Sequence, residues 1–357
     1  MNNLNILKQL SEAFGPSGFE EEINAIISNE FKSLKSFTRT EDGLGSVIFS
    51  KNTKSSLPVI SFVAHMDEIG YIVKYIDDRG FIKVQNLGGW LSQSMINQRW
   101  VIRTENKDII GISGIKTIHV MTPEDRKSFY KTNNELFIDV GATNKSDAIK
   151  IGIKPGNPIA PYSKVIELNN DRLLGKAWDD RIGCAMLIDL AKRVDDMTLS
   201  YGMNFVFTTQ EEIGLRGAMT TAYITNSDIC INLEVGVAGD FPYMTKDEAQ
   251  EKLGLGPSIF LHDSSMLPDK NLQNYIERIA SDNGINLQYE VLAGYGEDGA
   301  MYQQSRKGIP AINLGIPTRY LHCHNSVIDL NDYSNGVNLV DHILNDLNPD
   351  KINSIIN

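Results

Sequence analysis

The sequence is poor in cysteine: its 357 residues contain only three, Cys184, Cys230 and Cys323. An odd number without a regular spacing argues against a disulfide framework, so we expect a reducing compartment, the cytoplasm. The chain also lacks any apolar run near the ~20 residues that a membrane helix needs. Residues 1–14 lack the basic start and cleavage site of a signal peptide and have the pattern of a short amphipathic helix. We therefore expect no membrane partner.

Basic residues are in the minority, with 34 Lys and Arg against 45 Asp and Glu and a net charge of −11. No Lys/Arg cluster forms a basic stripe, which argues against a nucleic-acid partner. There is no Gly-x-Ser-x-Gly elbow, and Gly294 and Gly296 do not belong to a dinucleotide-binding fingerprint. These absences exclude the usual serine hydrolases and nucleotide binding. The length favours two domains.

The rest of the chain alternates between apolar strand patterns and helical patterns. Helical spacing covers 4–34, interrupted by the turn signal Gly-Pro-Ser-Gly at 15–18. The run 57–64 is typical of a fully buried strand. Further strands are expected at 173–177, 203–208, 229–233 and 311–314, and helices at 183–193 and 270–282. This alternation predicts an α/β fold with a mostly parallel central sheet flanked by helices.

Residues 68–164 have a different pattern. Short alternating runs separated by Gly- and Asp-containing turns predict a small β-rich domain, with strands at 69–76, 81–84, 100–104 and 109–115. We expect this segment to be inserted into a catalytic α/β domain formed by 1–67 and 165–357. The tail after Asn348 is polar and is expected to fray.

Five short segments concentrate side chains that bind metals, and four of them follow predicted strands. The segments are 64–67, 177–181, 210–214, 232–234 and 320–324. In open α/β sheets, sites form beyond the carboxyl ends of the strands, where distant residues converge. Any one of these side chains alone is common in structural roles. Several carboxylates buried together are costly unless cations neutralise them.

Charge counting favours two ions. Two divalent cations bring +4, which three carboxylates and one bridging hydroxide balance. Mixed histidine and carboxylate ligands suit zinc, cobalt or manganese. Two such ions ~3.5–4 Å apart polarise a carbonyl and generate hydroxide together.

Several longer motifs resemble those of one known family. They are His-Met-Asp-Glu-Ile-Gly at 65–70, Asp-Asp-Arg-Ile-Gly-Cys at 179–184, Gln-Glu-Glu-Ile-Gly-Leu-Arg-Gly-Ala at 210–218 and Pro-Thr-Arg-Tyr-Leu-His at 317–322. The inserted segment matches through 121–126 and 136–141. In order and spacing the chain resembles, over nearly its whole length, the co-catalytic metallopeptidases that include glutamyl aminopeptidase and the tetrahedral (TET) aminopeptidases. Some members are labelled endoglucanase.

The resemblance implies five metal ligands: His65, Asp179, Glu212, Glu234 and His322. His65, Asp179 and Glu234 would bind one metal, and Asp179, Glu212 and His322 the other, with Asp179 bridging. The choice of Asp179 over Asp180 depends on the family pattern, and Asp180 stays open as the alternative. Zinc is expected first, with cobalt or manganese as alternatives.

The resemblance also implies the reaction and the assembly. Glu211 would be the general base, and Asp67 would hydrogen-bond the far nitrogen of His65 and fix its tautomer. A hydroxide bridging the metals would remove the N-terminal residue from short peptides. The inserted domain of the family mediates dimers, which assemble into tetrahedral twelve-subunit particles, so we expect a homo-oligomer.

Three segments depart from the family pattern. Glu234 stands where the family usually has Asp, and Cys323-His324 stand where it usually has Ser-Pro. Glu297 lies in a segment where the family usually reads Gly-Thr-Asp-Ala-Gly. Its carboxylate either favours basic substrate residues or faces solvent. His324 offers an alternative ligand, although the spacing to Asp329 favours His322.

Three other functions are alternatives to an aminopeptidase. A deacylase could use the same metals. A glycosidase needs a free acid and a free base or nucleophile, which metal-bound carboxylates do not supply. A scaffold without activity would fit the three departures, but the retention of Glu211, both histidines and Asp179 argues against it.

Overall fold

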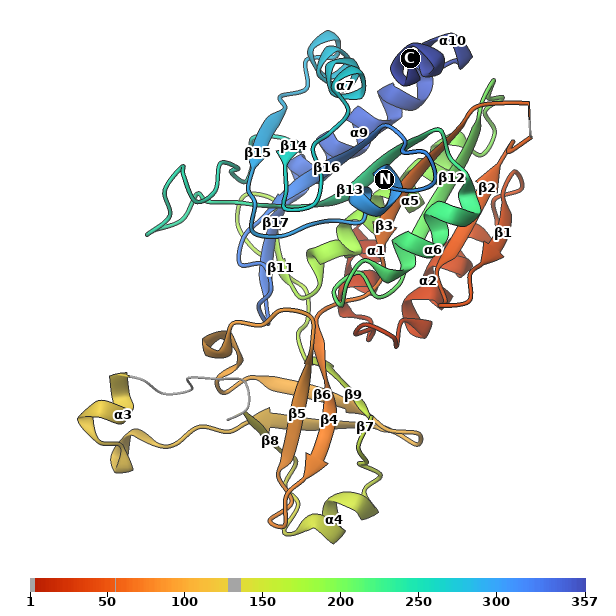
Figure 1. The fold of residues 1–357 in the computed structure, drawn as a ribbon. Coiled ribbons are helices and arrows are strands. Elements are labelled where there is room, and N and C mark those ends of the chain that lie inside the picture. The colour runs from red at the N-terminus through yellow and green to blue at the C-terminus, as the bar shows by residue number, and fades with distance from the viewer. Residues whose placement is uncertain (1–3, 55, 128–135) are drawn as a thin grey trace.

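The core of the protein is an eight-stranded mixed sheet (Figure 1). The computed structural model describes residues 4–54, 56–127 and 136–357. The four middle strands run parallel to one another, in the order β12 (Gly202–Thr208), β3 (Val59–His65), β13 (Ile229–Val237) and β16 (Ala311–Thr318). On one side, β1 (Thr38–Glu41) and β2 (Val47–Lys51) add antiparallel pairs. On the other side, β14 (Ser258–His262) pairs antiparallel with β16, and the edge strand β15 (Gln288–Val291) runs parallel to β14. The α/β prediction is confirmed, and the parallel part of the sheet is its centre.

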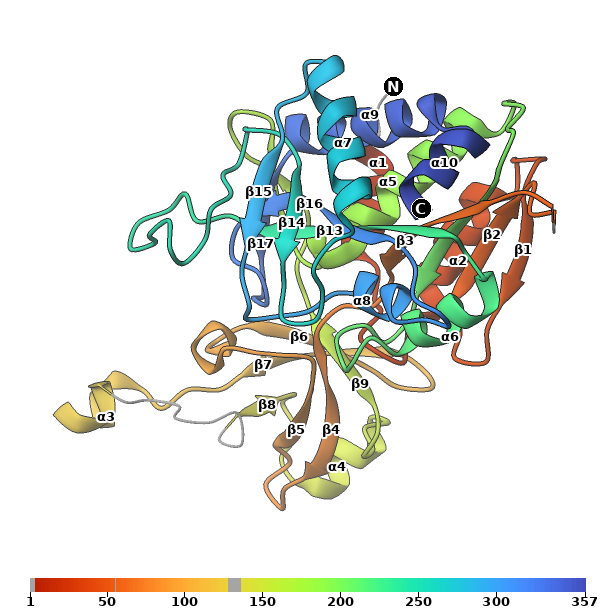
Figure 2. The same ribbon diagram turned by 45° about the horizontal axis from the view of Figure 1, so that its top comes forward.

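Helices cover both faces of this sheet (Figure 2). One face carries α1 (Leu4–Glu12), α2 (Glu21–Phe31), α5 (Trp178–Val194), α7 (Lys270–Asp282), α9 (Leu330–Asp346) and α10 (Pro349–Ile356). The other face carries α6 (Arg216–Thr225) and α8 (Gly299–Gln303). Because both faces are covered, β3, β12 and β13 are buried along almost their whole length, as their continuous apolar sequences predict.

The C-terminal tail corrects one expectation. It forms α10, which begins because the Asn348 side chain accepts a hydrogen bond from the Lys351 backbone N–H and Pro349 occupies the first turn. Ile352 and Ile355 are buried in the main hydrophobic core. The tail is therefore an amphipathic helix, and the expected fraying was wrong. Fraying was expected because most residues of the tail are polar, but two buried apolar residues lie three positions apart and form one face of the helix.

The segment after β3 forms a closed six-stranded barrel. Its strands are, in order around the barrel, β4 (Gly70–Ile76), β5 (Ile82–Leu87), β8 (Phe137–Asp139), β7 (Asp108–Ser113), β6 (Arg99–Arg103) and β9 (Pro158–Pro161). Short helices α3 (Pro123–Lys127) and α4 (Lys145–Lys150) and the 3₁₀ turns Ser92–Met95 and Ile118–Val120 connect them. The barrel has its own hydrophobic cluster around Trp100 and Tyr71. On this arrangement we propose the domain division at 68 and 164.

A small three-stranded sheet lies where the chain returns from the barrel: β10 (Ile166–Glu167), β11 (Arg172–Gly175) and β17 (Ser326–Asp329). The segment expected as a strand at 173–177 therefore joins this sheet rather than the central one. Across the described part of the chain, none of the helices is both long and apolar enough to span a bilayer. The cytoplasmic location stays a prediction.

Candidate metal centre

Distant segments converge at the carboxyl edge of the parallel strands. His65 is the last residue of β3, Glu211 and Glu212 follow β12, and His322 follows β16. Asp179 lies at the first turn of α5. The convergence follows from the parallel pairing, which brings the ends of β3, β12 and β16 to one edge.

Glu234 departs from the strand-end expectation. It lies inside β13, which continues to Val237 because it stays paired with β16 as far as Thr318. The Glu234 side chain is buried, with 1% exposed, so a strand-end residue facing water is also excluded.

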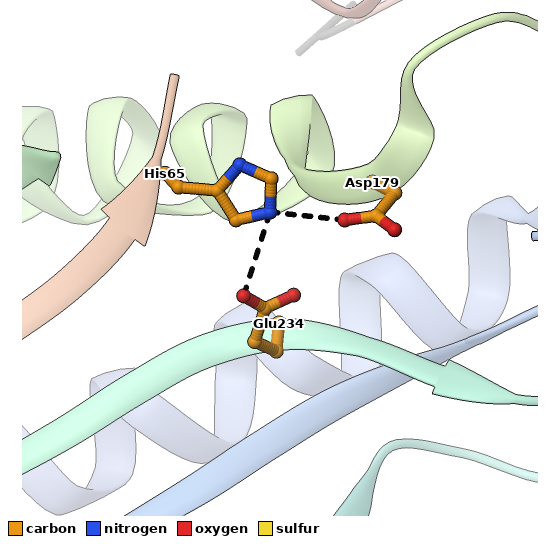
Figure 3. A group of neighbouring side chains, drawn as sticks. All are labelled: His65, Asp179 and Glu234. Carbon is orange, nitrogen blue, oxygen red and sulfur yellow. Dashed lines mark hydrogen bonds and ion pairs between the residues drawn. The ribbon is translucent and has the colours of Figure 1, made fainter. Parts of the chain in front are cut away.

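The first group joins one imidazole to two carboxylates (Figure 3). His65 Nε2 lies 2.9 Å from Asp179 Oδ1 and 3.6 Å from Glu234 Oε1. The same nitrogen lies 4.0 Å from Glu211 Oε2. The group therefore contains the three ligands expected for one metal, with the expected base beside them.

The second group shares Asp179. His322 Nε2 lies 3.4 Å from Asp179 Oδ2 and 3.5 Å from Glu212 Oε2. The two Asp179 oxygens thus face different imidazoles, as a bridging carboxylate requires. The Asp180 carboxylate instead accepts hydrogen bonds from the backbone N–H groups of His65 and Gly183. This geometry favours Asp179 over Asp180.

Asp67 contacts the far nitrogen of His65, as the resemblance implies, and also holds a neighbouring loop. His65 Nδ1 lies 3.1 Å from the Asp67 carbonyl oxygen and 3.4 Å from its carboxylate, so the carbonyl is the closer acceptor. The carboxylate accepts hydrogen bonds from the backbone N–H groups of Glu211, at 2.9 Å, and Glu212, at 3.2 Å. The Ser17 hydroxyl donates a further bond to it. Asp67 therefore holds the loop that carries Glu211 and Glu212.

The charges of the site are strongly coupled. Burial raises the pKa of Glu211 and Glu234, and it raises that of Glu212 to about 8. Burial alone would lower the pKa of His322, but Glu212 and Asp179 raise it to about 10. Burial would likewise raise the pKa of Asp179, yet His322 and His65 hold it below its usual range. These opposed shifts arise because the carboxylates are crowded together and two imidazoles lie among them.

The donor set fits divalent cations. Glu212 Oε1 and Glu234 Oε1 are buried without a hydrogen-bond partner in the part of the chain that the structure describes. Such orphaned oxygens are rare unless an ion or water satisfies them. In each group, the three ligand atoms lie within 4.8 Å of one another. Nitrogen and oxygen donors so placed suit zinc and its neighbours.

A cavity of about 530 Å³ opens beside the two groups. Its walls combine the site acids with apolar and glycine residues: Gly89, Asp179, Glu211, Glu212, Gly214, Leu215, Val235, Val237, Gly294, Tyr295, Gly296, Glu297, Leu321 and His322. Glu297 is buried and belongs to a third close group with Glu211 and Glu234, so the alternative in which it faces solvent was wrong.

His324 does not join the site. Its Nε2 faces the Tyr162 carbonyl oxygen at 3.3 Å, and its ring packs edge-on against Trp100. Burial lowers its pKa to about 4. It is thus a neutral residue of the interface with the barrel, and the alternative ligand is not supported.

Sequence reasoning missed a buried ion network behind the site. Lys176 pairs with Glu68 at 2.5 Å and donates to the Ala13 carbonyl oxygen. Arg181 donates to the Leu10 and Gly15 carbonyl oxygens. These bonds tie down the turn that contains Ser17. The signal for it in the sequence is weak: Lys176 immediately precedes the motif that contains Arg181, and Glu68 belongs to the motif that begins at His65.

Comparison with known proteins gives one consistent family. A family model described as M42 glutamyl aminopeptidase matches residues 45–339. The candidate aminopeptidase FrvX of Escherichia coli K12 is 36% identical, covering 99% of this chain and 98% of FrvX. A glutamyl aminopeptidase of Lactococcus lactis is 27% identical over 98% of both chains. A lysyl aminopeptidase of Pyrococcus furiosus is 28% identical, covering 96% and 97%.

Comparison with solved structures indicates the same family. A TET aminopeptidase from a Thaumarchaeota archaeon superposes with a TM-score of 0.95, 36% identity and 99% of both chains covered. The Pyrococcus horikoshii TET1 peptidase, which assembles into a tetrahedron or an octahedral shell, gives 0.88 and 28%, covering 97% of this chain and all of that one. These matches define a metallo-aminopeptidase. The chain belongs to the M42 glutamyl aminopeptidase family, a family that implies divalent metal ions.

Proposed function

We propose that this protein is a two-metal aminopeptidase that removes the N-terminal residue of short peptides. The observation that carries the proposal is the pair of imidazole–carboxylate groups that share Asp179. His65, Asp179 and Glu234 would hold one ion, and Asp179, Glu212 and His322 the other. Such ions, when bound, polarise the scissile carbonyl and make water acidic enough to attack at neutral pH.

Glu211 lies beside both groups, and neither group needs its carboxylate as a metal ligand. It lines the cavity, and its backbone N–H is held by Asp67. A carboxylate so placed takes the proton of the attacking water and then delivers it to the leaving amine. We therefore assign Glu211 as general base and acid, and Asp67 as the residue that positions it.

The test uses metal-free protein reloaded separately with zinc, cobalt and manganese. Each form is assayed with aminoacyl p-nitroanilides and with the corresponding Nα-acyl compounds. We expect hydrolysis of the free-amine substrates, fastest with zinc. Release of the acyl group from the Nα-acyl compounds, detected as the free-amine anilide and without release of p-nitroaniline from either set, would identify a deacylase. Absence of hydrolysis with all three metals would refute the catalytic proposal.

The barrel supports a proposal about assembly. Its β7 and the segment after it expose a row of large apolar side chains: Ile110, Ile112, Ile115, Ile118 and Val120. Contiguous exposed apolar groups mark interaction surfaces. We propose that this surface joins two copies of the chain, and that dimers build a larger particle like those of the TET relatives. Light scattering of wild type and Ile118→Glu checks this, with a smaller particle expected for the variant.

A further inference from the structure

One acid of the cavity has no role in the mechanism above. Glu297 lies just before α8 and its side chain is only 7% exposed. One of its carboxylate oxygens lies within 4.8 Å of an oxygen of Glu211 and an oxygen of Glu234. The carboxylate is therefore adjacent to both the base and a metal ligand, and it lines the cavity that a substrate would enter.

A charge count leaves Glu297 without a counterion. Two divalent ions bring +4, which the three carboxylate ligands balance together with one further negative charge, either Glu211 or the hydroxide left when Glu211 takes a proton from water. Among the described residues that line the cavity there is no Lys and no Arg. A buried carboxylate without a cation is costly, because its desolvation is not repaid. A positively charged group of the substrate would remove this cost on binding.

A peptide substrate can offer two kinds of cation, its α-ammonium group and a lysine side chain, and they differ in their distance from the scissile carbonyl carbon. The α-nitrogen lies ~2.5 Å from the scissile carbonyl carbon, given standard N–Cα and Cα–C bonds. A lysine ammonium lies five bonds beyond Cα. The base must reach the water that attacks this carbon, so a carboxylate with an oxygen within 4.8 Å of a Glu211 oxygen lies on the side of the reacting carbon, where the α-nitrogen is much closer than a lysine ammonium. The α-ammonium is therefore the better match.

We propose that Glu297 binds the free α-ammonium group of the substrate and thereby restricts the enzyme to unblocked N-termini. This inference depends on the proposed aminopeptidase function and deepens it. The remaining cavity wall is largely apolar, with Leu215, Val237 and Leu321, so the side chain of the N-terminal residue would be apolar. An acidic side chain would meet the site acids and find no basic partner in the lining.

The kinetic test compares leucine p-nitroanilide with 4-methylpentanoyl p-nitroanilide, which lacks only the amine. For zinc-loaded Glu297→Gln we expect KM for the leucine compound to rise roughly 10- to 100-fold, the factor that a charged hydrogen bond contributes. kcat should change much less, since the interaction exists before the transition state. The preference for the amine should shrink by the same factor. Glu297→Asp, which keeps the charge, should recover part of the preference for the amine.

Glu290→Gln is the matched control. Glu290 is also buried and accepts a hydrogen bond from the Val237 backbone N–H at 2.9 Å, but it does not line the cavity. Its variant should keep the wild-type preference for the amine. A loss of preference equal to that of Glu297→Gln would overturn the assignment, because any nearby carboxyl would then suffice.

A binding measurement completes the test without turnover. Calorimetry of zinc-loaded protein with leucinol, an amino alcohol, should show a dissociation constant roughly 10- to 100-fold weaker for Glu297→Gln. Elemental analysis should show unchanged zinc. Loss of a zinc ion would make Glu297 a metal ligand and overturn the proposal, as would unchanged leucinol binding. An inactive wild type would refute the aminopeptidase function itself, whereas an active enzyme with an unchanged preference in Glu297→Gln refutes only this inference.

Discussion

Replacing Asp67 by Asn tests how the site is held together. The Asp67 carboxylate accepts the Glu211 N–H on Oδ1, and it accepts the Glu212 N–H and the Ser17 hydroxyl on Oδ2. Asparagine replaces one of these oxygens by an NH₂ group. In either orientation, one backbone N–H of the 211–212 loop then faces another donor.

The lost hydrogen-bond acceptor determines how much stability and metal affinity Asp67→Asn should lose. A buried donor left without an acceptor costs about 1–3 kcal/mol, and more when the acceptor was charged. Carboxylates behind metal ligands change metal affinity by about 10- to 100-fold, which equals about 1.4–2.8 kcal/mol. We therefore expect Asp67→Asn to lose about 1–3 kcal/mol of unfolding free energy and to bind metal about 10- to 100-fold more weakly.

The assay is competition with a chelator of known affinity, combined with urea unfolding of the metal-free protein. Asp332→Asn is the control, because the Asp332 carboxylate accepts the Gly254 and Gly256 N–H groups, both at 2.7 Å, away from the site. It should lose stability in urea unfolding below about pH 5, where the Asp332 carboxyl still contributes, but keep metal affinity. If Asp67→Asn loses stability and binds metal as tightly as wild type, the positioning role is refuted.

Three further predictions concern the same structure. Glu211→Gln should lower kcat about 10²- to 10⁴-fold with both metals retained, measured by kinetics and elemental analysis; near wild-type activity would exclude it as the base. His65→Ala and His322→Ala should each reduce metal content, and full occupancy in both would contradict the ligand groups. Burial raises the pKa of Asp332 from its usual value near 3.8 to about 6, so its stabilising contribution is complete below pH 3.8 and is lost as the pH rises through about 6. The stability difference between wild type and Asp332→Asn should therefore fall between pH 4 and 7 in urea titrations, and a difference independent of pH would contradict the shift.

Strong periodic patterns were predictable from the sequence. The helix expected at 270–282 has those bounds in the structure, because Asp269 caps it and one face is continuously apolar. The strand expected at 203–208 differs from β12 by one residue. The tail after Asn348 was missed, because two buried isoleucines in a polar segment produce a weak signal until α7 and α9 provide a surface to cover.

The candidate site was predictable in composition but not in geometry. The residues expected as ligands do form two groups that share Asp179. The residue types that can bind metals and transfer protons occur together in short motifs, which the sequence displays directly. The choice between Asp179 and Asp180 was not readable there, because adjacent side chains differ only in direction. The same holds for Glu297, whose burial beside Glu211 and Glu234 depends on how the segment before α8 packs against the sheet.

Local periodicity and residue type made three features readable from the chain: the alternation of strands and helices, four of the six barrel strands, and the acids and imidazoles available for chemistry. Which of these acids become neighbours depends on tertiary packing. Parallel pairing of β3, β12, β13 and β16 brings residues more than a hundred positions apart within a few ångströms. The side chains that become neighbours, and therefore their charges, are set by that packing and not by any one segment.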